Sequence, residues 1–287
     1  MSAPSGTRAI GAGAAVAVLL LLLLVGLLPS GGRVAPKSVF EAGDAGRLAC
    51  WYLLEELGFD PVAWREAPGL LPRSEEILWL GAAPDDPPGY LKRVWDEMDE
   101  DAEPSPRDGP TVSRRLRDPR HYRRFVEEGG TLVVGLDDAR REFLVETLGF
   151  EELGELEAKI TPSESVQTAL LRHEERLDVA WDGERWLAPL APLHERLMVD
   201  ELGRPLAVRI QVGRGALAIL PSDDFLANDV IGEEDNALLL VRFLEELGPR
   251  GAVLFDEYAL GGWVPETPIE LAFAPSVFAF TMHLLLL

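Results

Sequence analysis

Short apolar runs alternate with amphipathic segments through the middle of the chain. Four runs contain three or more apolar side chains in succession, which is typical of strands buried on both faces of a sheet. They lie within residues 76–81, 131–135, 216–220 and 252–255. Because predicted helices separate most of these runs, the pattern favours a mostly parallel sheet with helices on both sides. We therefore predict an α/β fold, a three-layer α/β/α sandwich.

Three of the predicted helices end at a glycine, namely Gly58, Gly149 and Gly248. Glycine accepts the left-handed conformation that commonly follows the last turn of a helix. Two of these glycines are followed closely by an apolar run, at residues 59–64 and 252–255. We interpret this spacing as a helix-to-strand transition and not as a domain repeat.

Two regions depart from this rhythm. Residues 84–121 are rich in Pro, Asp, Glu and Arg and can bury little apolar area, so we predict a mobile insertion there. Residues 177–211 contain four short apolar segments separated by turn sequences such as Asp182-Gly183. They predict a small antiparallel β section attached to the parallel core.

Both ends of the chain are strongly apolar. Residues 9–28 contain only Ala, Gly, Val, Ile and Leu, and a helix of that length measures about 30 Å, the thickness of a bilayer core. We predict an N-terminal transmembrane helix there, with a cleaved signal peptide or a buried helix as alternatives. Residues 271–287 have no formal charge and predict a second, shorter span, with a C-terminal core element as the alternative. The predicted organisation is a tail at 1–8, a span at 9–28, a linker at 29–43, an α/β domain at 44–265 and a span at 271–287.

Charge changes this picture in two ways. The chain has 27 basic and 49 acidic residues, a net charge of −22, and this excess disfavours nucleic-acid binding. The acidic residues all lie between Glu41 and Glu270, in the segment between the two apolar ends. Basic residues flank the first apolar stretch on both sides, so they decide its orientation poorly. We expect location in the cell membrane, with the acidic domain outside the cytoplasmic membrane.

Polar side chains follow three of the predicted strands. In open α/β sheets, ligands bind beyond the carboxyl ends of the strands, where these side chains would converge. A cluster of carboxylate oxygens suits Mg²⁺ or Ca²⁺. The alternative is that these residues cap helices and face solvent, as Asp138 is predicted to do. The candidate ligand-binding residues are Asp137, Asp223, Asp224, Asn228, Asn236, Asp256 and Glu257.

Other catalytic patterns are missing from the sequence. It contains no nucleophile elbow, phosphate-binding loop or zinc-protease motif. The single cysteine, Cys50, lies within a predicted helix and is interpreted as a small buried hydrophobe. His173 and His194 stand alone among charged residues and are predicted to lie on the surface. We predict no cofactor.

The order of several short motifs resembles a known family. These are GDAG at 43–46, YRRFVEEGGTLVV at 122–134, GRGALAILPSD at 213–223, FLAN at 225–228, EDNA at 234–237 and VLFDEY at 253–258. Together they are similar to a bacterial family of membrane-anchored domains of unknown function with a class I glutamine amidotransferase-like, flavodoxin-like domain between two membrane helices. The resemblance covers nearly the whole chain.

The resemblance implies a fold but no reaction. True amidotransferases place a nucleophilic cysteine on the turn that would correspond here to residues 134–137, which contain neither Cys nor Ser. The resemblance therefore implies a pseudoenzyme. Relatives are encoded near a MoxR-type ATPase, which implies an assembly partner of that kind.

Three functions remain open at this point. The first is a membrane-tethered, non-catalytic binding or scaffold module of an envelope-associated assembly. The second is an enzyme that depends on a divalent metal held by the acidic residues at the strand ends. The third is a sensor whose acidic face meets a basic partner.

Overall fold

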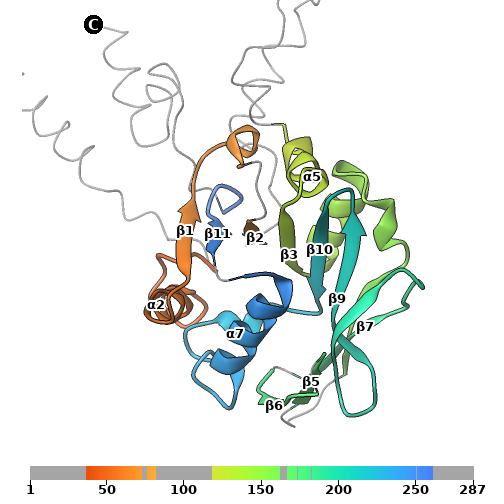
Figure 1. Cartoon of the computed structure of the whole chain (residues 1–287). Coiled ribbons are helices and arrows are strands. Elements are labelled where there is room, and N and C mark those ends of the chain that lie inside the picture. The colour runs from red at the N-terminus through yellow and green to blue at the C-terminus, as the bar shows by residue number, and fades with distance from the viewer. Residues whose placement is uncertain are drawn as a thin grey trace, which may run out of the picture. The chain divides into compact units, whose positions relative to one another are not determined.

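The apolar runs form strands of one large sheet (Figure 1). The computed structural model describes residues 37–72, 76–81, 118–161, 167–172, 174–181, 183–249 and 251–260. Within them a nine-stranded sheet has the order β1–β11–β2–β3–β10–β9–β8–β5–β6. Its strands are β1 (Asp60–Trp64), β2 (Ile77–Leu80), β3 (Thr131–Gly135), β5 (Gln167–Leu171), β6 (Arg176–Val179), β8 (Glu195–Val199), β9 (Pro205–Val212), β10 (Gly215–Leu220) and β11 (Ala252–Asp256). A separate pair, β4 (Glu157–Thr161) and β7 (Glu184–Ala188), is antiparallel.

The sheet consists of a parallel and an antiparallel half. Strands β1, β11, β2, β3 and β10 pair in parallel. From β10 onward, β9, β8, β5 and β6 pair antiparallel. The change occurs at the hairpin between β9 and β10, where Gly213 adopts a φ of 59° in a tight turn. A turn this short can join only antiparallel neighbours.

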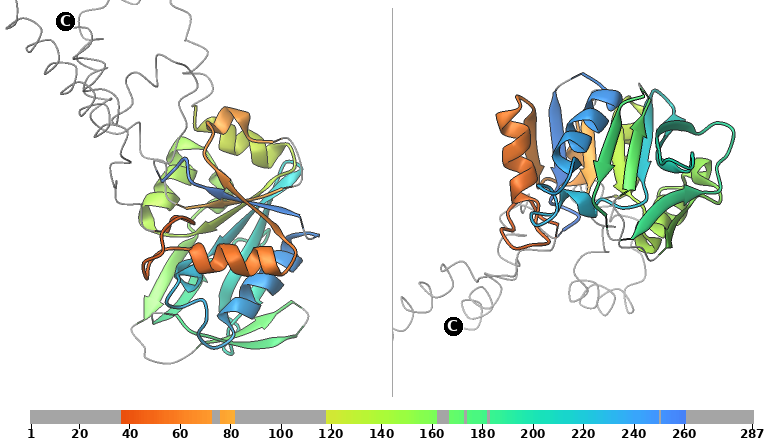
Figure 2. Two further views of the ribbon diagram at one scale, coloured as in Figure 1. Left: turned by 90° about the vertical axis from the view of Figure 1, so that its left-hand side faces the viewer. Right: turned by 90° about the horizontal axis from the view of Figure 1, so that it is seen from below.

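Side chains alternate between two hydrophobic clusters, one on each face of the sheet. Leu132 and Val134 of β3 enter one cluster, whereas Val133 enters the other. This is the two-residue period of a strand buried on both faces. Helices α2 (Leu48–Glu56) and α7 (Asn236–Leu247) contribute to one cluster. Helix α5 (Arg120–Glu127) and the π-helical turn η2 (Phe143–Thr147), which continues helix α6 (Asp138–Glu142), contribute to the other (Figure 2).

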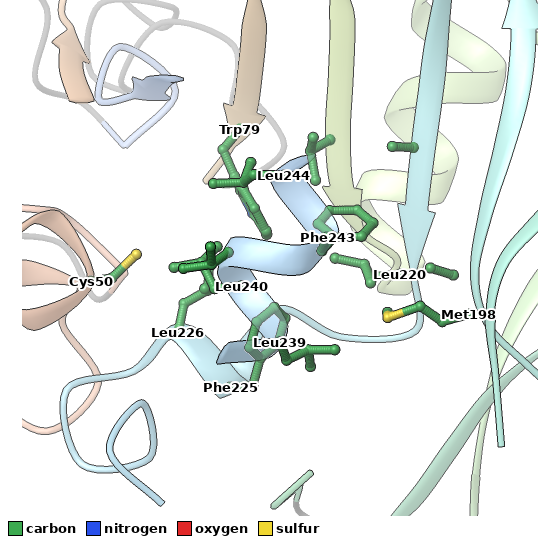
Figure 3. Packing of buried hydrophobic residues seen from close by; sticks show 14 of the residues in the cluster. Cys50, Trp79, Met198, Leu220, Phe225, Leu226, Leu239, Leu240, Phe243 and Leu244 are labelled. Carbon is green, nitrogen blue, oxygen red and sulfur yellow. The ribbon is translucent and has the colours of Figure 1, made fainter. Parts of the chain in front are cut away.

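Aromatic side chains fill the core beneath α7 (Figure 3). The Trp79 ring, fully buried, stacks on Phe255 at a centroid distance of 6.5 Å. It meets Phe225 and Phe243 edge-on, at 6.3 Å and 6.0 Å. Phe225 belongs to the short 3₁₀ turn η4 (Asp224–Leu226). Its burial therefore holds the chain that follows β10 against the sheet.

The predicted fold class is wrong in its main feature. The sheet is not mostly parallel, because the region expected to form a small antiparallel section instead extends the same sheet through β9, β8 and β6. Strands β4 and β5 were not predicted at all. The described chain is strand-rich with few helices, so the three-layer, glutamine amidotransferase-like and flavodoxin-like descriptions are also corrected. The physical reason is that one edge of β10 is left free by the parallel strands. Strand β9 pairs with that edge, so the expected parallel core and the expected antiparallel section form one sheet.

The predicted membrane anchoring is corrected as well. The two expected spans, residues 9–28 and 271–287, lie outside the described residues. Across the ranges that the structure does describe, no helix combines the length and apolar character needed to cross a bilayer. The predicted transmembrane helices, cell-membrane location, bacterial envelope and extracytoplasmic placement of the domain therefore find no support in the described residues and are not carried further.

Most of the predicted insertion also lies outside the described residues, since these resume at Asp118 and α5 begins at Arg120. The expected helix ends are found at Gly58 and Gly149, whose φ angles of 80° and 66° are left-handed. Gly248 follows α7 but has a φ of 172°, an extended conformation open to any residue. The left-handed prediction is therefore wrong at Gly248.

Candidate functional site

The carboxyl ends of the parallel strands meet at one edge of the sheet. The register pairs Leu220 with Gly135, and Leu80 with Val134. Phe255 pairs with Trp79, which brings the end of β11 to the same edge. The residues that follow these strands must therefore lie close together, as the sequence predicts for this topology.

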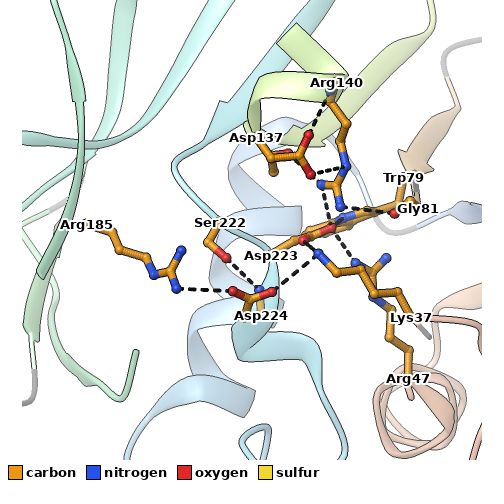
Figure 4. A network of polar contacts seen from close by, with 11 residues as sticks. Lys37, Arg47, Trp79, Gly81, Asp137, Arg140, Arg185, Ser222, Asp223 and Asp224 are labelled. Atoms are coloured by element: carbon orange, nitrogen blue, oxygen red, sulfur yellow. Dashed lines mark hydrogen bonds and ion pairs between the residues drawn. The ribbon is translucent and has the colours of Figure 1, made fainter. Parts of the chain in front are cut away.

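Asp223 is the centre of this edge (Figure 4). Its carboxylate is almost fully buried and contacts three cationic side chains. Lys37 Nζ lies 2.9 Å from Oδ1, Arg140 Nη1 lies 3.1 Å from Oδ2, and Arg47 Nη2 pairs with Oδ2. Burial opposes ionisation of Asp223, but the charges of Arg47, Arg140 and Lys37 outweigh it and hold the pKa of this carboxyl well below its usual range.

Arg140 joins the ends of three strands. Its backbone N–H donates to Asp137 Oδ1 at 2.7 Å, so Asp137 is the N-cap of α6. The guanidinium donates to the carbonyl oxygens of Gly135 at 2.5 Å and Gly81 at 3.0 Å, as well as to Asp223. Arg140 therefore links β2, β3 and the segment after β10. The predicted cap was Asp138, which instead is the first residue of α6.

Gly135 makes room for Asp223. A Cβ atom at Gly135 would lie 2.7 Å from the backbone nitrogen of Asp223 and 2.8 Å from its carboxylate carbon. Both distances are shorter than any relaxed carbon contact. A side chain at this last position of β3 would therefore displace the central carboxylate.

Asp224 forms the outer part of the same cluster. Its Oδ1 lies 3.3 Å from Lys37 Nζ and its Oδ2 lies 3.4 Å from Arg185 Nη2. Its backbone N–H donates to Ser222 Oγ at 3.1 Å. We call the whole set the rim cluster: Lys37, Arg47, Asp137, Arg140, Arg185, Asp223 and Asp224. Four cations and three carboxylates meet in it, which leaves one positive charge in excess.

Glu257, immediately after β11, holds the loop that precedes α2. Ser38 Oγ donates to Glu257 Oε2 at 2.7 Å, and the backbone N–H of Val39 donates to Oε1 at 2.8 Å. Both Ser38 and Glu257 are buried. Residues 37–43, expected to form a linker, are therefore bonded to the strand ends. They occupy part of the edge where an open α/β sheet would bind a ligand.

The two predicted asparagines tie separate segments together. Asn228 donates to the carbonyl oxygens of Glu41 and Gly43 at 2.9 Å and 2.7 Å, which closes the same loop. Asn236, the first residue of α7, donates to Ala180 O at 3.0 Å and accepts from Ala180 N at 3.1 Å. These bonds join α7 to the segment after β6, and none of the hydrogen bonds of the Asn236 side chain involves a residue of the rim cluster.

Asp256 ends β11 and is also fully buried. Its Oδ1 accepts from the backbone N–H of Ala259 at 3.0 Å. Burial, together with the charge of Glu257, raises its pKa to about 6, against the opposing influence of Ala259 and the Tyr122 hydroxyl. Within the described residues, neither Asp256 Oδ2 nor the Tyr122 hydroxyl has a partner of normal hydrogen-bond geometry. Their contact is therefore a weak one, and burial dominates.

The structure brings together three of the seven candidate residues, Asp137, Asp223 and Asp224, in the rim cluster. The others are structural ties or, for Asp256, a separate buried carboxyl. In the part of the chain that the structure describes, no group of three His, Cys, Asp or Glu side chains could hold a metal ion.

Sequence reasoning missed the cations of the rim cluster. Lys37 and Arg47 come from one loop, Arg140 and Arg185 come from two other, distant parts of the chain, and arginine is most often a surface residue. The one local signal is Arg140, three residues after Asp137 at a predicted helix start. Cys50 is buried in α2 as predicted, and burial raises its pKa to about 12.

Comparison with known proteins gives no functional assignment. The chain matches no protein-family model and no curated protein. It is similar to an exo-β-1,4-mannosidase from Opitutaceae bacterium strain TAV5 over 45% of this chain and 21% of that one, at 17% identity and a TM-score of 0.28. It is similar to the N-terminal domain of mmIFT52 over 60% and 96%, at 14% identity and a TM-score of 0.35. A β-galactosidase from Bacillus circulans sp. alkalophilus matches over 62% and 32%, at 13% identity and a TM-score of 0.31.

The chain thus spans about a fifth of the mannosidase and a third of the β-galactosidase that it matches. At these TM-scores the likenesses carry no argument about function. They also lend no support to an amidotransferase-like domain, so the resemblance in the motif order stays a prediction.

Proposed function

We propose that the domain is a non-catalytic binding or scaffold module. The observation that carries this proposal is that Asp223, the most central carboxylate at the strand ends, is enclosed and ionised. Three cations enclose it, and its lowered pKa keeps it ionised. A general base needs a pKa near the working pH and access to a substrate proton, and Asp223 has neither.

The end of β3, where an amidotransferase would carry its nucleophile, also lacks a starting atom for covalent catalysis. Gly135 is the last residue of β3, and Leu136 and Asp137 form the turn that follows it. The thiol of Cys50 is buried in α2, and its raised pKa keeps it protonated at neutral pH. The metal-dependent alternative needs a ligand group that is not found among the described residues.

A scaffold role agrees with how the polar groups are used. Glu257 and Asn228 fasten the 37–47 loop to the sheet, and Asn236 fastens α7. The net charge of −22 suits an assembly partner with a basic surface. Such an association should weaken as salt is added, because screening shortens the reach of surface charges.

The test is an activity screen of the purified full chain against simple esters and γ-glutamyl amides. We expect no turnover above that of buffer. The matched variant is Asp256→Asn, because Asp256 is a carboxyl whose pKa lies in the range of a general acid or base. Turnover by the native chain that disappears in this variant would overturn the proposal.

A further inference from the structure

We propose that the loop between β7 and β8 is a docking surface for a partner segment that carries an aliphatic side chain next to Lys or Arg. We call residues 189–193 the apolar loop. The inference deepens the proposed function and rests on it, since it names the surface and the kind of partner that a scaffold module built from this chain would use.

The apolar loop exposes hydrophobic side chains in a chain that is strongly acidic. Its sequence, PLAPL, consists of five apolar residues in succession, and four of them are exposed. Leu193 is 87% exposed, the highest value for a large hydrophobic residue among those that the structure describes. Single exposed hydrophobic residues are normal on a protein surface, whereas a contiguous group of them commonly marks an interaction site.

A cavity of about 300 Å³ lies beside the apolar loop. Pro189, Leu190 and Ala191 of the loop line it. Leu153 and Glu155, from the short 3₁₀ turn η3 (Glu151–Leu153) and the residues after it, also line it. A space of this size accommodates one aliphatic side chain and lies at the lower limit for a small-molecule ligand. The cavity therefore favours a side chain of a partner protein over a free ligand.

Acidic side chains lie next to the cavity on η3 and the residues after it. Glu151, Glu152 and Glu155 are all exposed. Two arginines lie nearby: Arg123 is 3.9 Å from Glu152, and Arg141 donates to backbone carbonyl oxygens at 3.0 Å and 3.3 Å. Neither cation closes on the three carboxylates. Their negative charge therefore favours Lys or Arg on a partner.

The apolar loop is held in shape before a partner arrives. The backbone N–H of His194 donates to Ala191 O at 3.0 Å, and the backbone N–H of Ala191 donates to His194 Nδ1 at 3.3 Å. Because Nδ1 accepts, Nε2 carries the proton and donates to Glu152 O at 3.0 Å. His194 thus joins the apolar loop to η3, the two segments that border the cavity. A preorganised surface loses less conformational entropy when it binds.

Charge also decides between a basic partner and other occupants of this surface. A second copy of the chain would bring a further net charge of −22, and an anionic membrane would be repelled in the same way. A segment that carries an aliphatic residue beside Lys or Arg fits both the cavity and the glutamates. We therefore assign the surface to a partner of that composition.

Selection of a random peptide display library on the immobilised full chain tests the proposal. We expect the enriched peptides to place an aliphatic residue beside Lys or Arg, and acidic peptides to be lost. Fluorescence anisotropy then gives the affinity of an enriched peptide for the native chain and for each variant. Affinity should fall as sodium chloride is added, because salt screens exposed charges.

Leu193→Ser removes the exposed aliphatic side chain of the apolar loop and should weaken peptide binding by about tenfold. The matched control is Leu202→Ser, since Leu202 is a 76% exposed leucine in the turn between β8 and β9 and does not line the cavity. It should leave the affinity unchanged. Thermal unfolding of each variant reports whether it is folded.

Glu155→Gln removes one carboxylate beside the cavity and should weaken binding by about threefold. Its control, Glu233→Gln, changes the net charge equally at an exposed glutamate before α7 and should have no effect. This pair separates a local contact from a general attraction of basic peptides to an acidic chain.

A library without enrichment, or enriched peptides that lack basic residues, would overturn the proposal. Equal affinity of a peptide for the Leu193→Ser and Leu202→Ser chains would also overturn it. A dimer of the native chain in sedimentation that Leu193→Ser dissociates would assign the apolar loop to a second copy instead. Each of these results leaves the non-catalytic proposal standing, because that proposal fails only if turnover is found.

Discussion

Replacement of Asp256 by Asn should remove a pH dependence of stability that this one carboxyl creates. Asp256 is fully buried at the end of β11, and its pKa is raised from 3.8 to about 6. The asparagine keeps an oxygen that can accept from Ala259 N–H and carries no charge at any pH. Its amide also gives the buried Tyr122 hydroxyl a possible partner.

The sign follows from where the proton is bound. Below pH 3.8, Asp256 is protonated in both the folded and unfolded chain, and its contribution to stability is fully present. As pH rises toward 6, the unfolded chain releases the proton while the folded protein retains it, so stability falls. A difference of about two pKa units corresponds to about 3 kcal/mol, lost once the pH exceeds 6. No discount for solvent is needed, because the carboxyl is 1% exposed.

Urea unfolding, followed by tryptophan fluorescence at several pH values between 4 and 8, measures this effect. The quantity to compare is the free energy of unfolding of Asp256→Asn minus that of the native chain. It should rise by about 2 kcal/mol across this range, because part of the loss of about 3 kcal/mol has already occurred at pH 4. The low-pKa carboxyl of Asp223 shifts stability in the opposite sense, being stabilising above pH 3.8, but it is common to both proteins and cancels.

Tyr122→Phe provides the matched comparison, because the Tyr122 hydroxyl opposes the rise in the pKa of Asp256. Its removal should extend the loss of stability to higher pH. A difference between Asp256→Asn and native chain that stays constant from pH 4 to 8 would refute the reasoning, since it would show that Asp256 is ionised and solvated in the folded protein.

Three further substitutions test the roles of buried residues by urea unfolding at pH 7. Asp223→Asn leaves three cations without their central carboxylate and should lower the free energy of unfolding by about 4 kcal/mol; a loss as small as that of the half-exposed Asp224→Asn, about 1 kcal/mol or less, would contradict this. Gly135→Ala places a Cβ 2.7 Å from the backbone of Asp223 and should lower stability by about 2 kcal/mol; an unchanged midpoint would show that the segment moves aside freely. Asn236→Ala removes the partners of both backbone groups of Ala180 and should lower stability by about 3 kcal/mol, a prediction that fails if the loss matches that of an exposed helix substitution.

The strands could be located from sequence because their apolar runs are continuous. Residues 131–135 form β3, and β2, β10 and β11 lie within one residue of their predicted positions. Burial on both faces leaves no polar position in such a strand, which makes the signal strong. Strand β4 is mostly exposed, and β5 alternates between buried and partly buried positions, so neither is fully buried on both faces, and both were missed. A continuous apolar run does not show whether the neighbouring strand is parallel or antiparallel to it. The size of the antiparallel half of the sheet was therefore underestimated.

At the candidate site, sequence reasoning identified the acids and not their partners. The topology of parallel strands was enough to predict that Asp137 and Asp223 meet, since both follow strands that pair in parallel. It could not show that Glu257 and Asn228 hold a loop, because those bonds join residues far apart in the chain.

The sequence alone thus determined which segments must be buried and at which edge of the sheet the acidic side chains collect, because both depend on local patterns of apolar residues. The tertiary structure alone decided what those acids do. Lys37, Arg47 and Arg140 reach Asp223 from positions 186, 176 and 83 residues away. Cations this far from Asp223 along the chain leave no sign in the sequence around it. Only folding brings them within the few ångströms over which they keep a buried carboxylate ionised.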